Sequence, residues 1–166
     1  MTLFVTEALS REHDRATFRS GVGVLDRYLR ELALQDIKRR VAGCFVALNE
    51  ARAIMGFYTL AATSVAVDAL PPDLTKRLPR YPLVPAVLMG RLAVAVEYQG
   101  RGLGRAHIFD AAIRTDRLGI GAFAIIVDAK DNRAVEFYRA NGFALIPGEG
   151  RRLFVPVATA LRGAND

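Results

Sequence analysis

A glycine-rich turn near the middle of the chain, residues 99–105, has the composition of an anion-binding site. It follows an apolar run, and from Leu103 onward apolar residues recur at helical spacing. Such a turn presents backbone N–H groups at the positive end of a helix dipole, and glycine lets an anion approach because it has no Cβ. Arg101 and Arg105 add positive charge. The turn therefore predicts a site for a phosphate-bearing ligand; a glycine-rich turn without a ligand is the alternative.

The spacing of the glycines distinguishes three kinds of phosphate-binding turn. A nucleotide P-loop ends in Lys followed by Ser or Thr, whereas Arg105 and Ala106 follow Gly104 here. The dinucleotide motif Gly-x-Gly-x-x-Gly places its third glycine one residue later than this chain does. Gln99, Gly102 and Gly104 instead fit the pattern Gln/Arg-x-x-Gly-x-Gly/Ala. This pattern resembles the motif with which GNAT N-acetyltransferases hold the pyrophosphate of acetyl-CoA.

A second motif lies at residues 132–143 and also resembles the GNAT family. It contains Asn132, the pair Phe137-Tyr138 and the pair Gly142-Phe143, in the order found at the C-terminal helix of GNAT enzymes. The two motifs together imply an acetyl-CoA-dependent N-acetyltransferase, formed by a single GNAT domain over residues 1–166. Core packing accounts for the phenylalanines, whereas the family counterpart of Tyr138 lies near the acetyl-CoA sulfur.

The GNAT resemblance implies a role for each residue of the site. Leu92, Ala93 and Val94 are expected to pair with the pantetheine arm like an added strand, and the N–H of Val94 is expected to polarise the thioester carbonyl. Tyr138 is expected to donate a proton to the departing thiolate. Asn132 is expected to hydrogen-bond the pantetheine region. The pyrophosphate is expected to lie against Gln99, Gly100, Arg101, Gly102, Leu103, Gly104 and Arg105.

A narrower resemblance covers nearly the whole chain. Ser20-Gly21 and residues 25–29, 78–85 and 90–94 are similar to segments of the GNAT toxins of toxin–antitoxin modules, the TacT/AtaT group. These toxins acetylate the α-amine of aminoacyl-tRNA and so stop translation. The resemblance implies an aminoacyl-tRNA substrate, a ribbon-helix-helix antitoxin as partner, and a homodimer. The family often has Cys-Gly in place of Ser20-Gly21 and an acidic residue in place of Ala95, so the preferred amino acid stays open.

The absence of an evident general base bears on the substrate. An α-amine with a pKa of about 7.7–8.0 is partly neutral near pH 7, whereas a lysine amine, near 10.4, is about a thousandfold more protonated. The sequence therefore favours α-amines, with Glu97 or a bound water as an alternative base. Arginines near the expected site could grip a tRNA acceptor stem through its phosphates, or could serve only solubility. They are Arg77, Arg80, Arg91, Arg151 and Arg152.

The elements that must position these residues follow from hydrophobic periodicity and turn signals. We expect strands at 3–6, 43–48, 53–63, 87–96, 122–127, 143–146 and 153–157. Helices are expected from residue 25 to about 40, in one piece or two, at 73–78, from 103 to before Gly119, and at 134–140, with 158–166 irregular. This order predicts an α/β fold, with a mixed, mostly antiparallel central sheet, splayed central strands and flanking helices.

Composition and length agree with one compact domain. The chain has 166 residues, of which 52% are hydrophobic, and a formal charge of +6 that suits a polyanionic partner or a solvated basic surface. A lone Cys44 and two separated histidines predict no disulfide and no metal site. No apolar run reaches the roughly 18 residues of a membrane span, and no signal peptide is evident. We therefore expect a cytoplasmic protein that does not contact a membrane.

Two other functions stay open at the level of sequence. A GNAT enzyme of this kind could acetylate a small-molecule amine or a protein N-terminus, and its turnover would then be independent of tRNA. A non-catalytic module that binds acyl-CoA or an antitoxin is the third possibility. Gln99, Gly102, Gly104, Asn132 and Tyr138 all match the catalytic family, which argues against this third possibility.

Overall fold

The computed structural model describes residues 5–163, which form two compact units. The N-terminal unit comprises the chain up to Ala61 together with Met89–Asp110, and the C-terminal unit comprises Ala62–Leu88 and the chain from Ala111 onward. Strand β3 (Ile54–Ala66) and helix α4 (Leu103–Arg117) each run from one unit into the other. Within residues 5–163, no helix is both long and apolar enough to cross a membrane.

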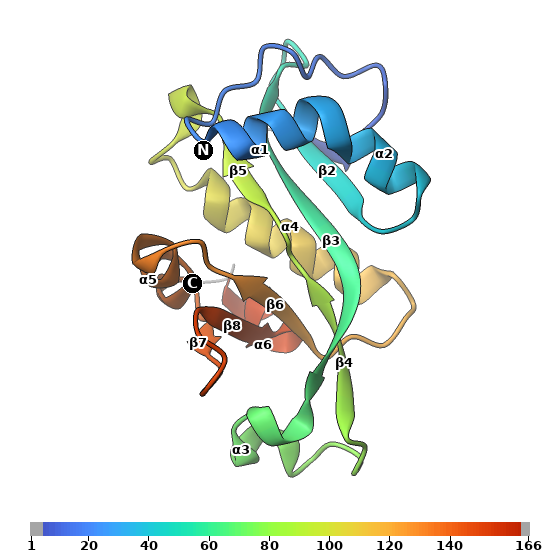
Figure 1. Cartoon of the computed structure of the whole chain (residues 1–166), viewed down its shortest axis with the longest axis vertical. Helices are drawn as coiled ribbons and strands as arrows, with labels where there is room; N and C mark the ends of the chain where they lie inside the picture. The colour runs from blue at the N-terminus through green and yellow to red at the C-terminus, as the bar shows by residue number, and fades with distance from the viewer. Residues whose placement is uncertain (1–4, 164–166) are drawn as a thin grey trace. The chain divides into compact units, whose positions relative to one another are not determined.

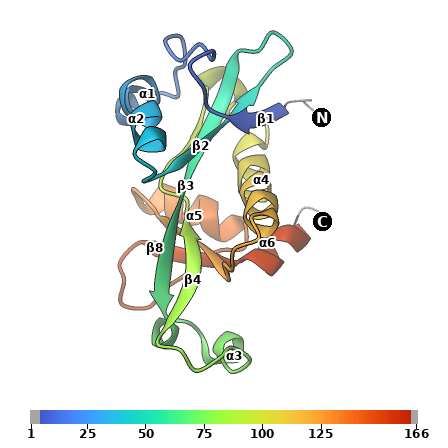
Figure 2. The same cartoon turned by 90° about the vertical axis from the view of Figure 1, so that its right-hand side faces the viewer.

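The N-terminal unit is an antiparallel sheet with helices on both faces. Its strands lie in the order β1 (Val5–Ala8), β2 (Gly43–Leu48), β3 and β5 (Leu92–Val94). One face is covered by α1 (Gly23–Arg27), the π-helix η1 (Tyr28–Leu32) and α2 (Ala33–Lys38), and the other by the first half of α4 (Figures 1 and 2). A short 3₁₀ turn, η3 (Val96–Tyr98), joins β5 to the glycine-rich turn. The expected first helix is therefore continuous, with a π-helical middle.

Aromatic packing holds the first helical segment on this sheet. Phe57 of β3 is fully buried; its ring meets Phe18 edge-on, with centroids 5.6 Å apart, and stacks on Tyr28 at 6.3 Å. Val46 and Leu48 of β2 join the same core cluster, in the alternation expected of a strand. Burial of these large apolar side chains is the main force that fixes η1 against the sheet.

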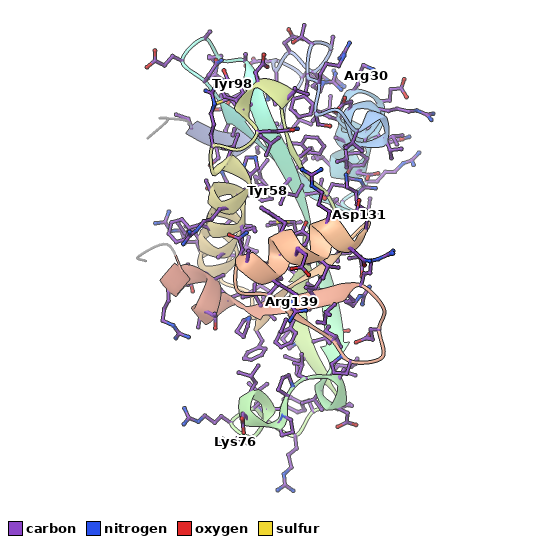
Figure 3. All side chains as sticks on the ribbon, turned by 90° about the vertical axis from the view of Figure 1, so that its left-hand side faces the viewer. Arg30, Tyr58, Lys76, Tyr98, Asp131 and Arg139 are labelled. Atoms are coloured by element: carbon purple, nitrogen blue, oxygen red, sulfur yellow. The ribbon has the colours of Figure 1, made fainter. Side chains whose placement is uncertain are left out.

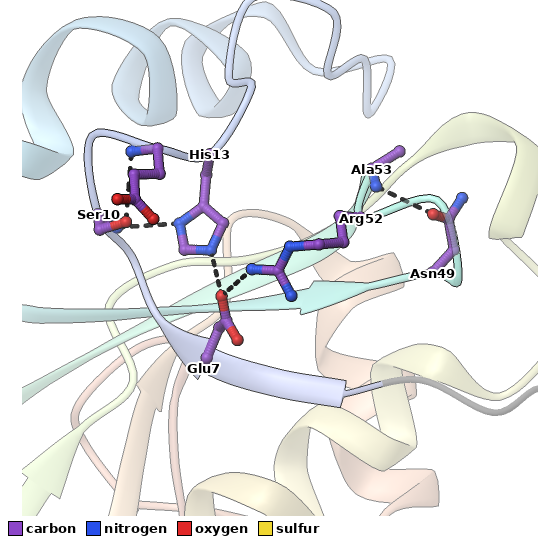
Figure 4. A network of polar contacts seen from close by, with 7 residues as sticks. Glu7, Ser10, His13, Asn49, Arg52 and Ala53 are labelled. Atoms are coloured by element: carbon purple, nitrogen blue, oxygen red, sulfur yellow. Dashed lines mark hydrogen bonds and ion pairs between the residues drawn. The ribbon is translucent and has the colours of Figure 1, made fainter.

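The end of β1 is fixed by a polar network around Glu7 (Figure 4). Ser10 N donates to His13 Nδ1 at 2.9 Å, so the other ring nitrogen, Nε2, carries the proton and donates to Glu7 at 2.6 Å. Arg52 donates to the same carboxylate oxygen at 2.6 Å. The hydrogen bonds from His13 and then Arg52 lower the pKa of Glu7. The network ties the N-terminal strand to the β2–β3 turn.

The C-terminal unit has a mixed sheet. Its strands lie in the order β3, β4 (Leu83–Leu88), β6 (Ala124–Asp128), β8 (Arg152–Pro156) and β7 (Ala144–Leu145). The pair β4–β6 is parallel, whereas β6–β8 and β7–β8 are antiparallel. The helices are η2 (Val67–Ala69), α3 (Pro72–Thr75), the second half of α4, α5 (Asn132–Ala140) and α6 (Val157–Arg162). Residues 124–127 of β6 are at most 1% exposed, which agrees with the uninterrupted apolar run in the sequence.

The expected fold class, a mixed and mostly antiparallel sheet with flanking helices, is confirmed. The single strand expected at 87–96 is wrong: β4 ends at Leu88 and β5 begins at Leu92, because β4 pairs with β6 whereas β5 pairs with β3. The expected irregular end is wrong for 158–162, where buried Val157 and Ala160 anchor α6. Of the expected strand 3–6, residues 3 and 4 lie outside the described part of the chain, and β1 begins at Val5.

Candidate active site

The glycine-rich turn has the backbone conformation that glycine is needed for. Gly100 and Gly102 have φ of +77° and +83°, in the left-handed region that other residues rarely adopt. A Cβ at either position would meet nothing within 4 Å, so conformation rather than local crowding requires glycine. Helix α4 begins directly afterwards, and Ala106 N donates to Gly102 O at 3.0 Å. Buried Leu103 anchors this helix start in the core of the N-terminal unit.

Gln99 braces the turn from the inside. Its side-chain Nε2 donates to Val94 O at 2.9 Å and to Ser20 O at 2.7 Å. The side-chain amide therefore ties the end of β5 to the loop before α1 and fixes the position of the turn. Sequence reasoning missed this role because Ser20 lies 79 residues away in the chain.

Ser20, whose carbonyl accepts from Gln99, is itself held in place by hydrogen bonds to Asp26. Its N–H and hydroxyl both donate to Asp26 Oδ1, at 3.0 and 2.6 Å, and both residues are buried. Gly21 follows with φ of +88°, which turns the chain into α1. A buried carboxylate with two donors from one residue fixes the loop conformation, because leaving it unpaired would cost the desolvation of a charge. The sequence marked Ser20 only as a subgroup feature.

The register of β5 decides which of its backbone groups face β3. Thr59 N donates to Arg91 O at 3.1 Å, and Ala95 N donates to Met55 O at 2.8 Å. Directly opposite pairs alternate between bonded and non-bonded in an antiparallel ladder. Alternate residues of this segment, starting from 91, therefore direct their N–H and C=O groups toward β3.

Leu92 and Val94 fall on the other side of this alternation. Their partners across the ladder are Tyr58 and Gly56, and their backbone groups point away from β3. The Val94 carbonyl accepts from Gln99, which agrees with this direction. Ala93, by contrast, directs its groups to β3. The register thus favours Leu92 and Val94, rather than Ala93, as backbone partners for an extended ligand arm.

Helix α4 approaches the back of β5 through a histidine that the sequence did not single out. His107 is fully buried, and neither ring nitrogen has a hydrogen-bond partner. Burial lowers its pKa to about 4, with a smaller opposing effect of the Asp110 charge, so the imidazole is neutral near pH 7. The ring packs beside Tyr58, labelled in Figure 3, whose hydroxyl donates to Asp110.

Gly56 makes this close approach possible. A Cβ at this position of β3 would lie 2.5 Å from His107 Nε2 and 2.7 Å from Ala93 O. Both distances are too short for real side chains, and both neighbours are held in the core. The glycine therefore sets the spacing between the helix that begins at the turn and the strand that carries Val94.

Tyr138, in the C-terminal unit, has the protonation state that an acid requires. Asp131 caps α5 by accepting from Ala134 N at 2.8 Å. The ring of Tyr138 is 8% exposed and packs edge-on against Phe137 and Phe143, each at 5.2 Å between centroids. Burial raises its pKa to about 12, so the phenol keeps its proton throughout the neutral range.

The expected tRNA-binding arginines fall into two groups. Arg77, Arg80 and Arg151 are exposed, and Arg151 Nε donates to Asn132 Oδ1 at 3.3 Å. Arg152 instead forms a bidentate ion pair with Asp128. Its Nε donates to Oδ1 at 2.8 Å and its Nη2 donates to Oδ2 at 3.0 Å. The guanidinium of Arg91 lies 3.6 Å above the centre of the Tyr28 ring. These last two side chains therefore already have partners within their own units.

Among residues 5–163, no group of His, Cys, Asp and Glu side chains has the arrangement of a metal site. Cys44 is buried, and burial raises the pKa of its thiol to about 12, so it is not poised as a nucleophile.

Comparison with known proteins identifies the family. Residues 40–145 match the acetyltransferase (GNAT) domain. The chain is 36% identical, over 149 residues, to a tRNA-acetylating toxin of Mycobacterium tuberculosis (strain ATCC 25618 / H37Rv), covering 89% of this chain and 88% of that protein. The chain therefore belongs to the GNAT acetyltransferases and is closely related to tRNA-acetylating toxins.

Solved structures agree with this assignment. AtaT complexed with acetyl-methionyl-tRNAfMet is 26% identical with a TM-score of 0.85, over 94% of this chain and 96% of that one. AtaTR bound with acetyl-CoA is 25% identical with a TM-score of 0.80, over 95% of each chain. A mutant AtaT toxin bound to the C-terminus of the antitoxin AtaR, 22% identical over 95% of each chain, shares the fold with a TM-score of 0.78. The resemblance expected from the sequence is confirmed.

Proposed function

We propose that this GNAT enzyme moves the acetyl group of acetyl-CoA to the α-amine of an aminoacyl-tRNA, and that it acts as the translation-blocking toxin of a toxin–antitoxin pair. The backbone of the N-terminal unit carries the proposal. The left-handed glycines lead into the N-terminus of α4, and the N–H groups of Leu92 and Val94 point away from β3. Relatedness to a tRNA-acetylating toxin, at 36% identity, supports the choice of acceptor.

Residues of this chain take part in each step of the proposed reaction. The N–H groups of residues 100–105 and the Arg101 and Arg105 side chains hold the pyrophosphate. Leu92 and Val94 pair with the pantetheine arm, and Asn132 adds a hydrogen bond to it. The neutral amine attacks the thioester carbonyl and forms the C–N bond, while Val94 N–H stabilises the oxyanion. The C–S bond then breaks, Tyr138 gives its proton to the thiolate, the ammonium proton leaves to water, and water returns a proton to the Tyr138 phenolate.

The acceptor contacts follow from the two groups of arginines. Arg77, Arg80 and Arg151 are the proposed phosphate contacts, because they are exposed. Arg91 and Arg152 are better explained as structural, since Tyr28 and Asp128 already engage them. We extend the proposal to a ribbon-helix-helix antitoxin, to a homodimer, and to action in the cytoplasm, where charged tRNA is present.

Replacement of Tyr138 by Phe tests the chemistry while keeping the ring that packs against Phe137 and Phe143. The enzyme is incubated with labelled acetyl-CoA and total charged tRNA, and the acetylated aminoacyl group is identified. Tyr138→Phe should lower the acetyl-transfer rate about 10²–10⁴-fold with little change in acetyl-CoA affinity. Tyr81→Phe, which also removes one phenol, from a ring that is 68% exposed, is the matched control and should stay near the wild-type rate. If the wild-type enzyme leaves charged tRNA unmodified, aminoacyl-tRNA is not its acceptor.

A further inference from the structure

The connection between β3 and β4, residues 67–82, is an ordered feature of the C-terminal unit (Figure 1). Val67 N donates to Pro82 O at 3.1 Å and closes its base. Leu70 is buried, and Leu74 and Leu78 pack against the same core cluster. Prolines at 71, 72, 79 and 82 restrict its backbone further. A surface held in this way loses little conformational entropy when it binds a ligand.

This connection lines a cavity of about 520 Å³ that is open to solvent. The volume lies within the range of small-molecule sites, roughly 300–1,000 Å³. Polar and apolar atoms contribute about equally to its wall, and Asp68, Thr75 and Arg80 are among the polar residues. The mixture suits a flat, partly polar ligand.

Tyr81 is an aromatic ring that the fold leaves open. It is 68% exposed, and its N–H donates to Pro79 O at 2.8 Å, so a tight turn between two prolines fixes its backbone. Exposed cations lie close to it in the chain: Arg80 directly precedes it, and Arg77 and Lys76 stand four and five residues earlier. Figure 3 shows Lys76 extending outward from the C-terminal unit. An open aromatic face beside several cations is the arrangement with which proteins bind single-stranded nucleic acid.

We propose that this cavity binds an unpaired nucleobase of the RNA substrate, stacked on Tyr81, with the adjoining phosphates held by Lys76, Arg77 and Arg80. The inference rests on the proposed function and deepens it, because a tRNA offers unpaired bases at its 3′ end. Asp68 accepts hydrogen bonds from amino groups on the base edge. An acidic peptide fits less well, because Asp68 in the wall and Asp73 on α3 repel carboxylates.

Binding of RNA without acetyl-CoA tests the site apart from catalysis. The probes are a fluorescent RNA hairpin with a short single-stranded 3′ end and the same hairpin with a blunt end, and the readout is fluorescence anisotropy. Tyr81→Leu should weaken binding of the overhang probe about 5–100-fold and leave the blunt probe unchanged. Tyr81→Phe keeps the stacking face and should bind within about twofold of wild type. Ile120→Ala, another exposed side chain of the same unit, is the control and should change neither probe.

The outcomes separate this site from the proposed function. If Tyr81→Leu binds both probes as tightly as wild type, or loses affinity for both equally, the base site is wrong even when charged tRNA is acetylated. If charged tRNA is not acetylated but the overhang preference depends on Tyr81, the base site stands and the acceptor assignment fails. Thermal unfolding of each variant shows whether a loss of affinity reflects a loss of fold.

Discussion

Replacement of Gly56 by Ala should disturb the spacing between α4 and β5. The added Cβ would lie 2.5 Å from His107 Nε2 and 2.7 Å from Ala93 O, so the helix, the strand or both must move. Overpacking of this kind costs about 1–3 kcal/mol. For a chain of this size, that corresponds to a fall in Tm of about 3–10 °C. Urea unfolding gives the free energy, and differential scanning calorimetry gives Tm.

The double variant Gly56→Ala/His107→Ala tests the cause. Truncating His107 removes one of the two clashes. The loss of unfolding free energy in the double variant should therefore be smaller, by about 1–2 kcal/mol, than the sum of the losses in the two single variants. Gly23→Ala is the control, because a Cβ there meets nothing within 4 Å, and its effect should stay within about 0.5 kcal/mol. The reasoning fails if Gly56→Ala is as stable as wild type, or if the two single effects simply add.

Three further predictions concern the same units. The folded pKa of His107, about 4, lies below its ordinary value of 6.5, so the unfolded chain takes up this proton first as the pH falls, and about 3 kcal/mol of stability is lost between pH 6.5 and 4. Urea unfolding at several pH values should show that His107→Gln loses less stability over this pH range than wild type. Equal losses would contradict the lowered pKa of His107. Gln99→Leu removes two hydrogen bonds and should cost about 1–3 kcal/mol of stability and weaken acetyl-CoA binding in calorimetric titration, whereas unchanged affinity would show that the turn needs no brace. Arg77→Ala should lower the salt dependence of tRNA binding by about one phosphate contact, and Arg152→Ala should not, because Asp128 pairs with it; similar slopes for both would refute the division of the arginines.

The sequence predicted best the features that depend on neighbouring residues. The turn before α4 and the buried strand β6 both rest on local spacing, and both appear in the structure. The break between β4 and β5 was missed because both strands are apolar, so one run of residues conceals a change of partner. Helix α6 was missed because it is only six residues long and gives a weak periodic signal.

The roles of individual side chains were harder to predict, because their partners are distant in sequence. Gln99 was expected at a pyrophosphate, and only the folded chain brings the Ser20 carbonyl to its amide. Arg152 was expected at tRNA, and only strand pairing places Asp128 beside it. The contact of Gly56 with His107 has no sequence signal, because a glycine within a strand does not indicate which side chain approaches it.

The bond from Gln99 to Ser20 has a thermodynamic consequence. A coenzyme that orders the glycine turn also restrains Ser20 and, through Asp26, the beginning of α1. A ligand of α1 that binds the ordered form of this segment more tightly than the disordered form then shares a coupling free energy with the coenzyme, and each changes the affinity of the other by the same factor. An inhibitor that grips α1 would therefore alter coenzyme affinity without occupying the coenzyme's own site.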